Sequence, residues 1–256
     1  MHTVRRGPRA APAFTLVEAL VVVAVIALLV GLTLPALSSA RRAAVATADL
    51  SNLRGLAVAH LSYMSGNEDR FVDVGLPHGS LANESQSFVE RLRPWFDRAD
   101  LAFRSPLDES PHWPAEVGGE GEPVVASTPP LYRRTSYGMN NYLSRTYSPA
   151  VALDGEGAGA DRLQQVRDHE RTVCFLLMAA RGPYASADHP HVEEWSASPQ
   201  PARTASSQVQ LNAVDRRKAG PGSQSNYAFV DGHVSTHAFD DLFRSAADNR
   251  FDPSLQ

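Results

Sequence analysis

An apolar run at residues 14–34 is the feature that most constrains this chain. At about 1.5 Å per helical residue the run spans roughly 30 Å, which is the thickness of the hydrocarbon core of a bilayer. The residues before it carry three arginines and no acid, so we expect the N-terminus to stay cytoplasmic. Residues 14–35 are therefore predicted to form a single transmembrane helix.

Three fates of this segment fit the sequence: a removed secretory signal, a permanent anchor, or a signal cut on the cytoplasmic side of the apolar run. A secretory signal has an apolar region of about 7–15 residues, shorter than this one, although ALSSA at 36–40 offers a small-residue cut site. Glu18 is the discriminating residue, because an acid at the centre of a spanning helix costs about 2.5–3.5 kcal/mol. Its plainest explanation is a capping box with Thr15, in which the helix dipole also favours the acid.

Residues 13–18, AFTLVE, followed by an apolar helix, resemble the class III signal of type IV prepilins and type II secretion pseudopilins. The resemblance implies that a prepilin peptidase cuts between Ala13 and Phe14 and methylates the new amine of Phe14. It also implies that Glu18 meets the N-terminal amine of a neighbouring subunit. Pro35 stands where many family members have a helix-kinking proline. The residue before the cut is usually glycine in the family, and here it is Ala13.

This resemblance implies a structural subunit of a pilus or pseudopilus and no enzymatic activity. The expected partners are prepilin peptidase, like or related pilin subunits, an inner-membrane assembly platform and the lipid bilayer. The expected location is the inner membrane, as a single-pass protein with a periplasmic or extracellular head. The alternative is a membrane-anchored extracytoplasmic binding or hydrolytic domain that does not polymerise.

Composition adds two restrictions. The chain of 256 residues has a net charge of −4, and loss of an arginine-bearing leader makes it more negative, which argues against nucleic acid as a partner. The one cysteine, Cys174, excludes an internal disulfide. It lies in an apolar segment, 172–178, that is typical of a buried strand, so a buried structural thiol is expected.

The helix is expected to continue past Pro35 to about residue 65, with a bend at the proline. Apolar residues at three- and four-residue spacing predict an amphipathic half over 36–66. The expected buried stripe is Leu50, Leu53, Ala57, Leu61 and Met64, and the expected polar side holds Asp49, Asn52, Arg54 and Ser62. Gly66-Asn67 is predicted to end the helix.

After a leader at 1–13 and the helix, residues 67–256 are predicted to form the head. We expect an extended piece at 71–74, a helix over 85–97 with Trp95 among its apolar residues, and a surface loop over 104–130. The predicted fold class is α+β: a long N-terminal helix, transmembrane in its first half, packed on a small antiparallel sheet in a pilin-like manner.

The strongest hairpin signal is Asp231-Gly232 between the alternating segments 226–230 and 233–239. It predicts a two-residue type I′ turn, with Phe229 opposite Val234 and Tyr227 opposite Thr236.

Three segments, RSPLD at 104–108, SYGMN at 136–140 and NYAFVDGHV at 226–234, resemble recurring segments of a large pilin-like family abundant in planctomycetes and related bacteria. Members of that family pair a prepilin N-terminus with a C-terminal His-x9-Asp-Gly signature. This chain departs from the pattern at two positions. Pro221 stands ten residues before Asp231 in place of the histidine, and Ser105 stands where the family usually has cysteine.

Acids and histidines in the head are weighed as metal ligands. A structural calcium ion would draw on Asp231, Asp240 and Asp241, or on Asp154 and Glu156, and the alternative is solvated surface charge. A zinc ion would draw on His189, His191, His233 and His237, but the last two lie about 13 Å apart along a strand. We therefore expect no cofactor and no metal site, and a structural calcium ion is the alternative left open. The sequence has no hydrolase elbow, phosphate loop or dinucleotide fingerprint.

Overall fold

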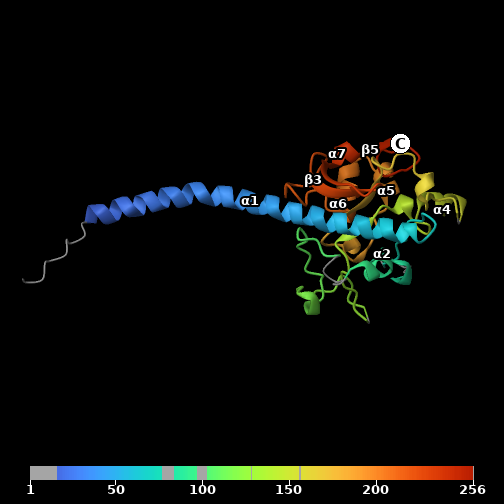
Figure 1. Cartoon of the computed structure of the whole chain (residues 1–256), viewed down its shortest axis with the longest axis horizontal. Helices are drawn as coiled ribbons and strands as arrows, with labels where there is room; N and C mark the ends of the chain where they lie inside the picture. The colour runs from blue at the N-terminus through green and yellow to red at the C-terminus, as the bar shows by residue number, and fades with distance from the viewer. Residues whose placement is uncertain (1–15, 77–83, 97–102, 128, 156, 256) are drawn as a thin grey trace, which may run out of the picture. The chain divides into compact units, whose positions relative to one another are not determined.

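The computed structural model of the chain describes residues 16–76, 84–96, 103–127, 129–155 and 157–255. The chain divides into two compact units, one ending at Ala44 and the other running from Val45 to Gln256. Helix α1 (Leu16–Ser65) contributes to both, and Figure 1 shows it as one unbroken ribbon from blue to cyan. The predicted continuation of the helix through Pro35 to residue 65 is confirmed.

The C-terminal end of α1 lies where it is predicted, but Gly66 is not the left-handed residue. The Gly66 amide donates to the Tyr63 carbonyl at 3.1 Å, and the Asn67 amide donates to the Met64 carbonyl at 2.9 Å. Positive φ occurs further on, at Glu68 and Asp69, both with φ of 56°. The chain therefore turns away from the helix two residues later than a glycine cap predicts.

The second unit contains a four-stranded antiparallel sheet in the order β1-β2-β3-β4, formed by β1 (Tyr137–Met139), β2 (Val173–Leu177), β3 (Gln224–Phe229) and β4 (Val234–Ala238). Tyr137 pairs with Leu177 and Met139 with Phe175. The predicted strand at 172–178 is confirmed, and Cys174 in it is buried. A long helix with a small antiparallel sheet makes the fold α+β, as expected.

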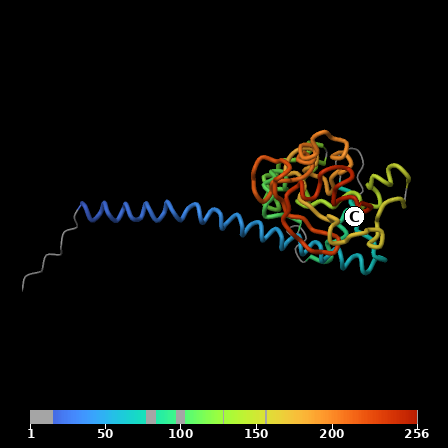
Figure 2. The backbone as a smooth tube through the Cα atoms, turned by 90° about the horizontal axis from the view of Figure 1, so that it is seen from above, coloured from blue at the N-terminus to red at the C-terminus, as the bar shows by residue number. Residues whose placement is uncertain are grey.

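The sheet has an apolar core on each face. On one face the α1 side chains of Leu53, Leu56 and Met64 cluster with buried residues of β1, β2 and β3. On the other face Trp195 packs against three phenylalanines (Phe239, Phe243 and Phe251) with ring centroids 5.2 to 5.8 Å apart. Figure 2 shows the cyan half of α1 running beside the rest of the second unit. Both faces of β2 are covered, which explains its continuous apolar sequence.

The buried face of α1 differs from the predicted stripe. Leu53, Ala57 and Met64 are buried as expected, whereas Leu50 and Leu61 are only half-buried. Asp49, predicted on the polar side, is completely buried. Residues 49, 53, 56, 60 and 64 follow one another at four- and three-residue spacing, so the true stripe contains an aspartate and His60.

Two predictions for residues 84–130 are wrong. In place of one helix over 85–97 there are three short turns, because Pro94 removes a backbone donor from the helical ladder. Trp95, predicted on the apolar side, is 44% exposed. The segment 104–130 is not a surface loop throughout, since Asp108 and Trp113 are buried.

The β3–β4 hairpin exists, but its register differs from the prediction by one residue. Tyr227 pairs with Ser235 and Ala228 pairs with Val234. The Phe229 amide donates to the His233 carbonyl at 3.0 Å, so the loop holds three residues, 230–232. Gly232 has φ of 87°, the left-handed position that closes a three-residue loop.

The remaining elements are short. They are η1 (Glu84–Gln86), α2 (Phe88–Arg91), η2 (Arg93–Trp95), η3 (Ala115–Val117), η4 (Asn141–Leu143), α4 (Pro149–Asp154), η5 (Leu163–Gln165), η6 (Pro183–Ser186), α5 (Val192–Ala197), α6 (Pro201–Gln208), α7 (Phe239–Leu242), β5 (Phe243–Ser245) and β6 (Asp248–Asn249). Among them, α2 packs on the α1 face of the sheet, and α5 and α7 pack on the other face.

Candidate functional site

The first half of α1 is an exposed apolar surface. Every large apolar side chain from Leu16 to Leu37 is between 45% and 80% exposed. The helix meets the length and composition of a membrane span, with a mean hydropathy of 2.8 in its most apolar window. A continuous apolar surface of this extent is covered in a functioning protein, by lipid or by other apolar helices. One candidate membrane-spanning helix near the N-terminus is consistent with a single-pass membrane protein.

Glu18 and Pro35 mark the two ends of this surface. Glu18 lies in the first turn of α1, and Pro35 lies inside the helix, about 26 Å further along at 1.5 Å per residue. Because proline has no amide hydrogen, the Gly31 carbonyl has no helical donor, while the Ser38 hydroxyl donates to the Pro35 carbonyl at 2.9 Å. The predicted processing residues Ala13 and Phe14 lie outside the described residues, as does Thr15.

The second half of α1 is held in the second unit through Asp49. Its Oδ1 accepts hydrogen bonds from the Ser105 hydroxyl at 2.5 Å and the Tyr137 hydroxyl at 2.8 Å. Its Oδ2 accepts from the side-chain amide of Asn226 at 2.8 Å, and the same amide donates to the Ala46 carbonyl at 3.0 Å. Burial raises the pKa of Asp49, although the three donors oppose that shift.

The three donors come from the three segments that carry the second sequence resemblance. Ser105 belongs to 104–108, Tyr137 to 136–140 and Asn226 to 226–234. Segments that are far apart in the chain therefore meet at one carboxylate of α1. A serine hydroxyl at position 105 supplies a donor at that point. In the fold, the three segments hold α1 in place through hydrogen bonds to the Asp49 carboxylate.

A second buried carboxylate, Asp108, extends the network away from α1. Its Oδ2 accepts from Arg133 Nε at 2.7 Å, from the Ser136 hydroxyl at 2.5 Å and from Trp113 Nε1 at 3.1 Å. Both side chains of the Asp108–Arg133 ion pair are fully buried. The Ser105 amide donates to the Ser136 hydroxyl at 2.8 Å, which links the two carboxylates.

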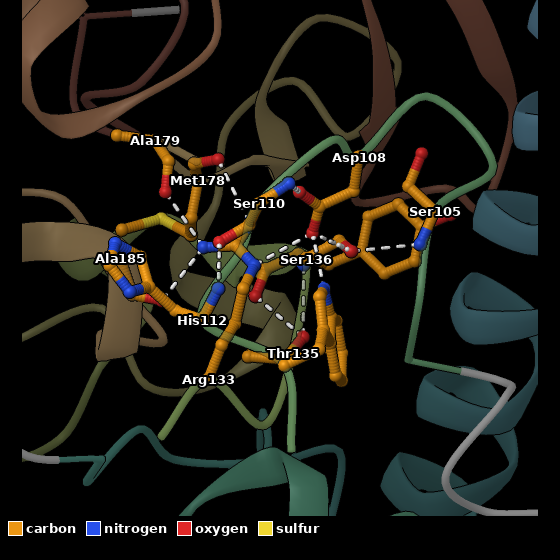
Figure 3. A network of polar contacts seen from close by, with 12 residues as sticks. Ser105, Asp108, Ser110, His112, Arg133, Thr135, Ser136, Met178, Ala179 and Ala185 are labelled. Carbon is orange, nitrogen blue, oxygen red and sulfur yellow. Dashed lines mark hydrogen bonds and ion pairs between the residues drawn. The ribbon is translucent and has the colours of Figure 1, made fainter. Parts of the chain in front are cut away.

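Arg133 makes four hydrogen bonds in this network, and Figure 3 shows its contacts with the surrounding carbonyls. Its guanidinium donates to the carbonyls of Ala179 and Ala185, both at 2.7 Å, and of Met178 at 3.1 Å. Burial lowers the pKa of Arg133, and the charge of Asp108 opposes that shift. The buried pair therefore ties the 104–113 segment to the end of β2.

Helix α1 also contacts the Asp231-Gly232 turn. The Arg54 guanidinium donates to the Gly232 carbonyl. A Cβ at Gly232 would lie 2.7 Å from Leu61 Cδ1, so the helix side chain approaches the turn closely. Asp231 Oδ1 accepts from the His233 amide at 3.0 Å and lies 2.7 Å from His233 Nδ1. The predicted structural role of this turn has a physical basis: glycine serves both the positive φ and the contact with α1.

The histidines and acids considered as metal ligands from the sequence do not form a shared site in the described part of the chain. Those residues contain no group of three or more histidine, cysteine, aspartate or glutamate side chains placed to share an ion. His233 faces Asp231, while His237 Nε2 lies 2.8 Å from the Ser235 hydroxyl. His189 and His191 face separate acids, Asp188 and Glu193, each at 2.9 Å. Asp240 and Asp241 open α7, Asp154 ends α4, and Glu156 lies outside the described residues.

His60 is the second polar residue of α1 that the sequence prediction missed. Its Nε2 accepts from the Val72 amide at 3.2 Å, so the neutral ring carries its proton on Nδ1, 3.4 Å from the Cys174 sulfur. Burial lowers the pKa of His60 to about 3. Its signal in the sequence is the 49–53–56–60–64 periodicity, which also places Asp49 inside.

Comparisons with protein-family models, curated proteins and solved structures find no match to this chain. Its function is therefore inferred from the geometry above and from the signal in its first 18 residues.

Proposed function

We propose that this protein is a structural subunit of a pilus or pseudopilus. The observation that carries the proposal is a single helix whose exposed apolar first half has Glu18 in its first turn and whose second half packs in an α+β unit. Such a helix can exchange lipid for the matching helices of other copies without altering the unit that it carries. Assembly, not catalysis, is the activity this arrangement supports.

In this proposal Glu18 makes the contact between subunits that distinguishes an assembling helix from a plain membrane anchor. After cleavage between Ala13 and Phe14, the amine of Phe14 is a cation close to the start of the apolar surface. In an apolar environment the amine of one copy and Glu18 of a neighbour form a charge pair, and removal of one partner of a buried pair typically costs 3–5 kcal/mol. The pair fixes the register of helices that otherwise present only interchangeable aliphatic side chains.

The same proposal assigns partners and location. Prepilin peptidase processes the chain, like or related subunits cover the apolar surface in the filament, and an inner-membrane platform extracts the subunit from the bilayer. The basic leader stays in the cytoplasm, and the second unit lies in the periplasm or outside the cell.

Replacement of Glu18 by glutamine separates this proposal from the capping-box explanation. Glutamine at the third helical position still completes a capping box, but it cannot pair with a cationic amine. The proposal expects Glu18→Gln to insert in the membrane at wild-type levels and to lose filaments and the formaldehyde cross-linked ladder above the monomer. The measurement requires a host that supplies the peptidase and the assembly platform.

Thr15→Ala is the matched control, because it removes the capping box and keeps the acid. The proposal expects Thr15→Ala to assemble. Equal loss of assembly in both variants, or wild-type assembly by Glu18→Gln, would show that Glu18 acts only as a cap. A wild-type chain that is never processed and gives no ladder would instead favour the membrane-anchored binding or hydrolytic domain.

A further inference from the structure

Three arginines line one cleft of the second unit. The cleft has a volume of about 770 Å³ and is lined by Arg70, Arg145 and Arg162 together with Thr146, Asp161 and Gln165. Arg70 follows the C-terminal end of α1, whereas Arg145 and Arg162 come from the chain between η4 and η5. Nothing in the assembly function proposed above uses this concentration of cations.

Arg70 and Arg162 are directly opposite each other along the backbone. They are the two partners of an isolated antiparallel β-bridge. Like charges directly opposite each other on paired strands destabilise the pairing. Arg70 Nε is also buried and has no hydrogen-bond partner among the described residues. The fold therefore tolerates two unfavourable features at one position, and an anion in the cleft would offset the repulsion between the two arginines.

Among the described residues, the acids near the cleft neutralise its arginines incompletely. Glu68 lies 3.2 Å from the Arg162 guanidinium but is 77% exposed, so the pair is screened by water. Asp73 lies 3.8 Å from Arg145 and already accepts hydrogen bonds from the hydroxyls of Ser144 and Thr146 at 2.5 and 2.6 Å. Asp161 is the one acid, of the residues that the structure describes, that lines the cleft itself. Arg70 has no ion pair within the described part of the chain.

We propose that this cleft binds a phosphate group carrying at least two negative charges. Guanidinium groups present planar forks of N–H donors that match the oxygens of a phosphate in pairs. The side-chain amide of Gln165, which uses one of its two hydrogens on the Gly159 carbonyl at 3.3 Å, adds a neutral donor to the cleft lining. A monovalent carboxylate would leave the like-charged arginines largely uncompensated, which is why the multiply charged anion is preferred. The phosphate comes either from a soluble compound or from a lipid headgroup.

The test is the binding of inorganic pyrophosphate to the full-length protein in nonionic detergent micelles at low salt, by titration calorimetry. Arg70→Gln and Arg145→Gln are expected to weaken binding at least tenfold. Arg244→Gln is the control, because Arg244 is 65% exposed and pairs with Asp248 outside the cleft. Tryptophan fluorescence, to which the buried Trp113 and Trp195 contribute, reports whether each variant is folded. If Arg70→Gln does not fold, the test rests on Arg145→Gln. The Arg145 side chain is 43% exposed, so its replacement should not disturb the fold.

Micelles doped with phosphatidic acid distinguish the two sources. Displacement of pyrophosphate from wild type by the doped micelles indicates a lipid headgroup, and its absence indicates a soluble phosphate. Either result supports the site. The proposal is overturned if wild type does not bind pyrophosphate, or if the two cleft variants bind it as tightly as wild type and Arg244→Gln do.

Discussion

Asp49→Ala should be among the most damaging single substitutions in the second unit. Asp49 is fully buried and accepts hydrogen bonds from Ser105, Tyr137 and Asn226. Alanine leaves three buried donors without an acceptor, and each such donor costs about 1–3 kcal/mol. Removal of a carboxyl group whose pKa is raised by burial recovers part of that cost. We expect the free energy of unfolding to fall by about 3–5 kcal/mol, a large share of a typical 5–15 kcal/mol.

The assay is urea unfolding of a chain that begins at Arg41, followed by the fluorescence of the buried Trp113 and Trp195. Asp49→Asn keeps an acceptor for two donors and should lose only about 1–2 kcal/mol. Ser51→Ala, at an exposed position of the same helix, should change the free energy of unfolding by less than about 0.5 kcal/mol. A loss below 1 kcal/mol for Asp49→Ala would refute the view that this carboxylate seats the helix.

Three further predictions concern the same unit. Gly232→Val should lower the free energy of unfolding in urea by about 1–3 kcal/mol, because a β-branched residue is strained at positive φ. Between pH 6.5 and about 3 the unfolded chain binds a proton at His60 that the native chain does not, so stability falls with falling pH by about 1.4 kcal/mol per unit. His60→Gln should remove that part of the slope, and an unchanged slope would contradict the assignment. Deletion of residues 1–40 should yield a soluble monomer by light scattering, whereas deletion of 1–65 exposes the apolar core and should aggregate.

The long helix, the β2 strand and the existence of the β3–β4 hairpin could be predicted from the sequence alone. Each rests on a local signal: a continuous apolar run, a short apolar segment, and Asp-Gly between alternating residues. The predicted register was wrong because Asp-Gly is compatible with both a two-residue and a three-residue loop. Only the pairing of the two strands shows that Val230 belongs to the loop. Register is a property of two strands, whereas the turn signal is a property of one.

The buried polar network could not be predicted from local patterns. Asp49 and Asp108 are charged residues, and on their own they indicate solvent exposure. Their burial depends on donors contributed by segments more than 20 residues away in the sequence, such as Arg133 and Asn226. The helical periodicity of 49, 53, 56 and 60 was the one available signal for Asp49. For Asp108 the sequence offered only its place in a recurring segment.

The identity of the mature N-terminus tests the central claim most directly. Intact-mass spectrometry and N-terminal sequencing of protein extracted from membranes measure it without any variant. The account predicts a chain that begins at Phe14, with one methyl group on its amine. A chain that retains its basic leader would indicate a plain anchor. A chain that begins at Arg41 would indicate a removed secretory signal, and either result would contradict assembly through the N-terminal helix.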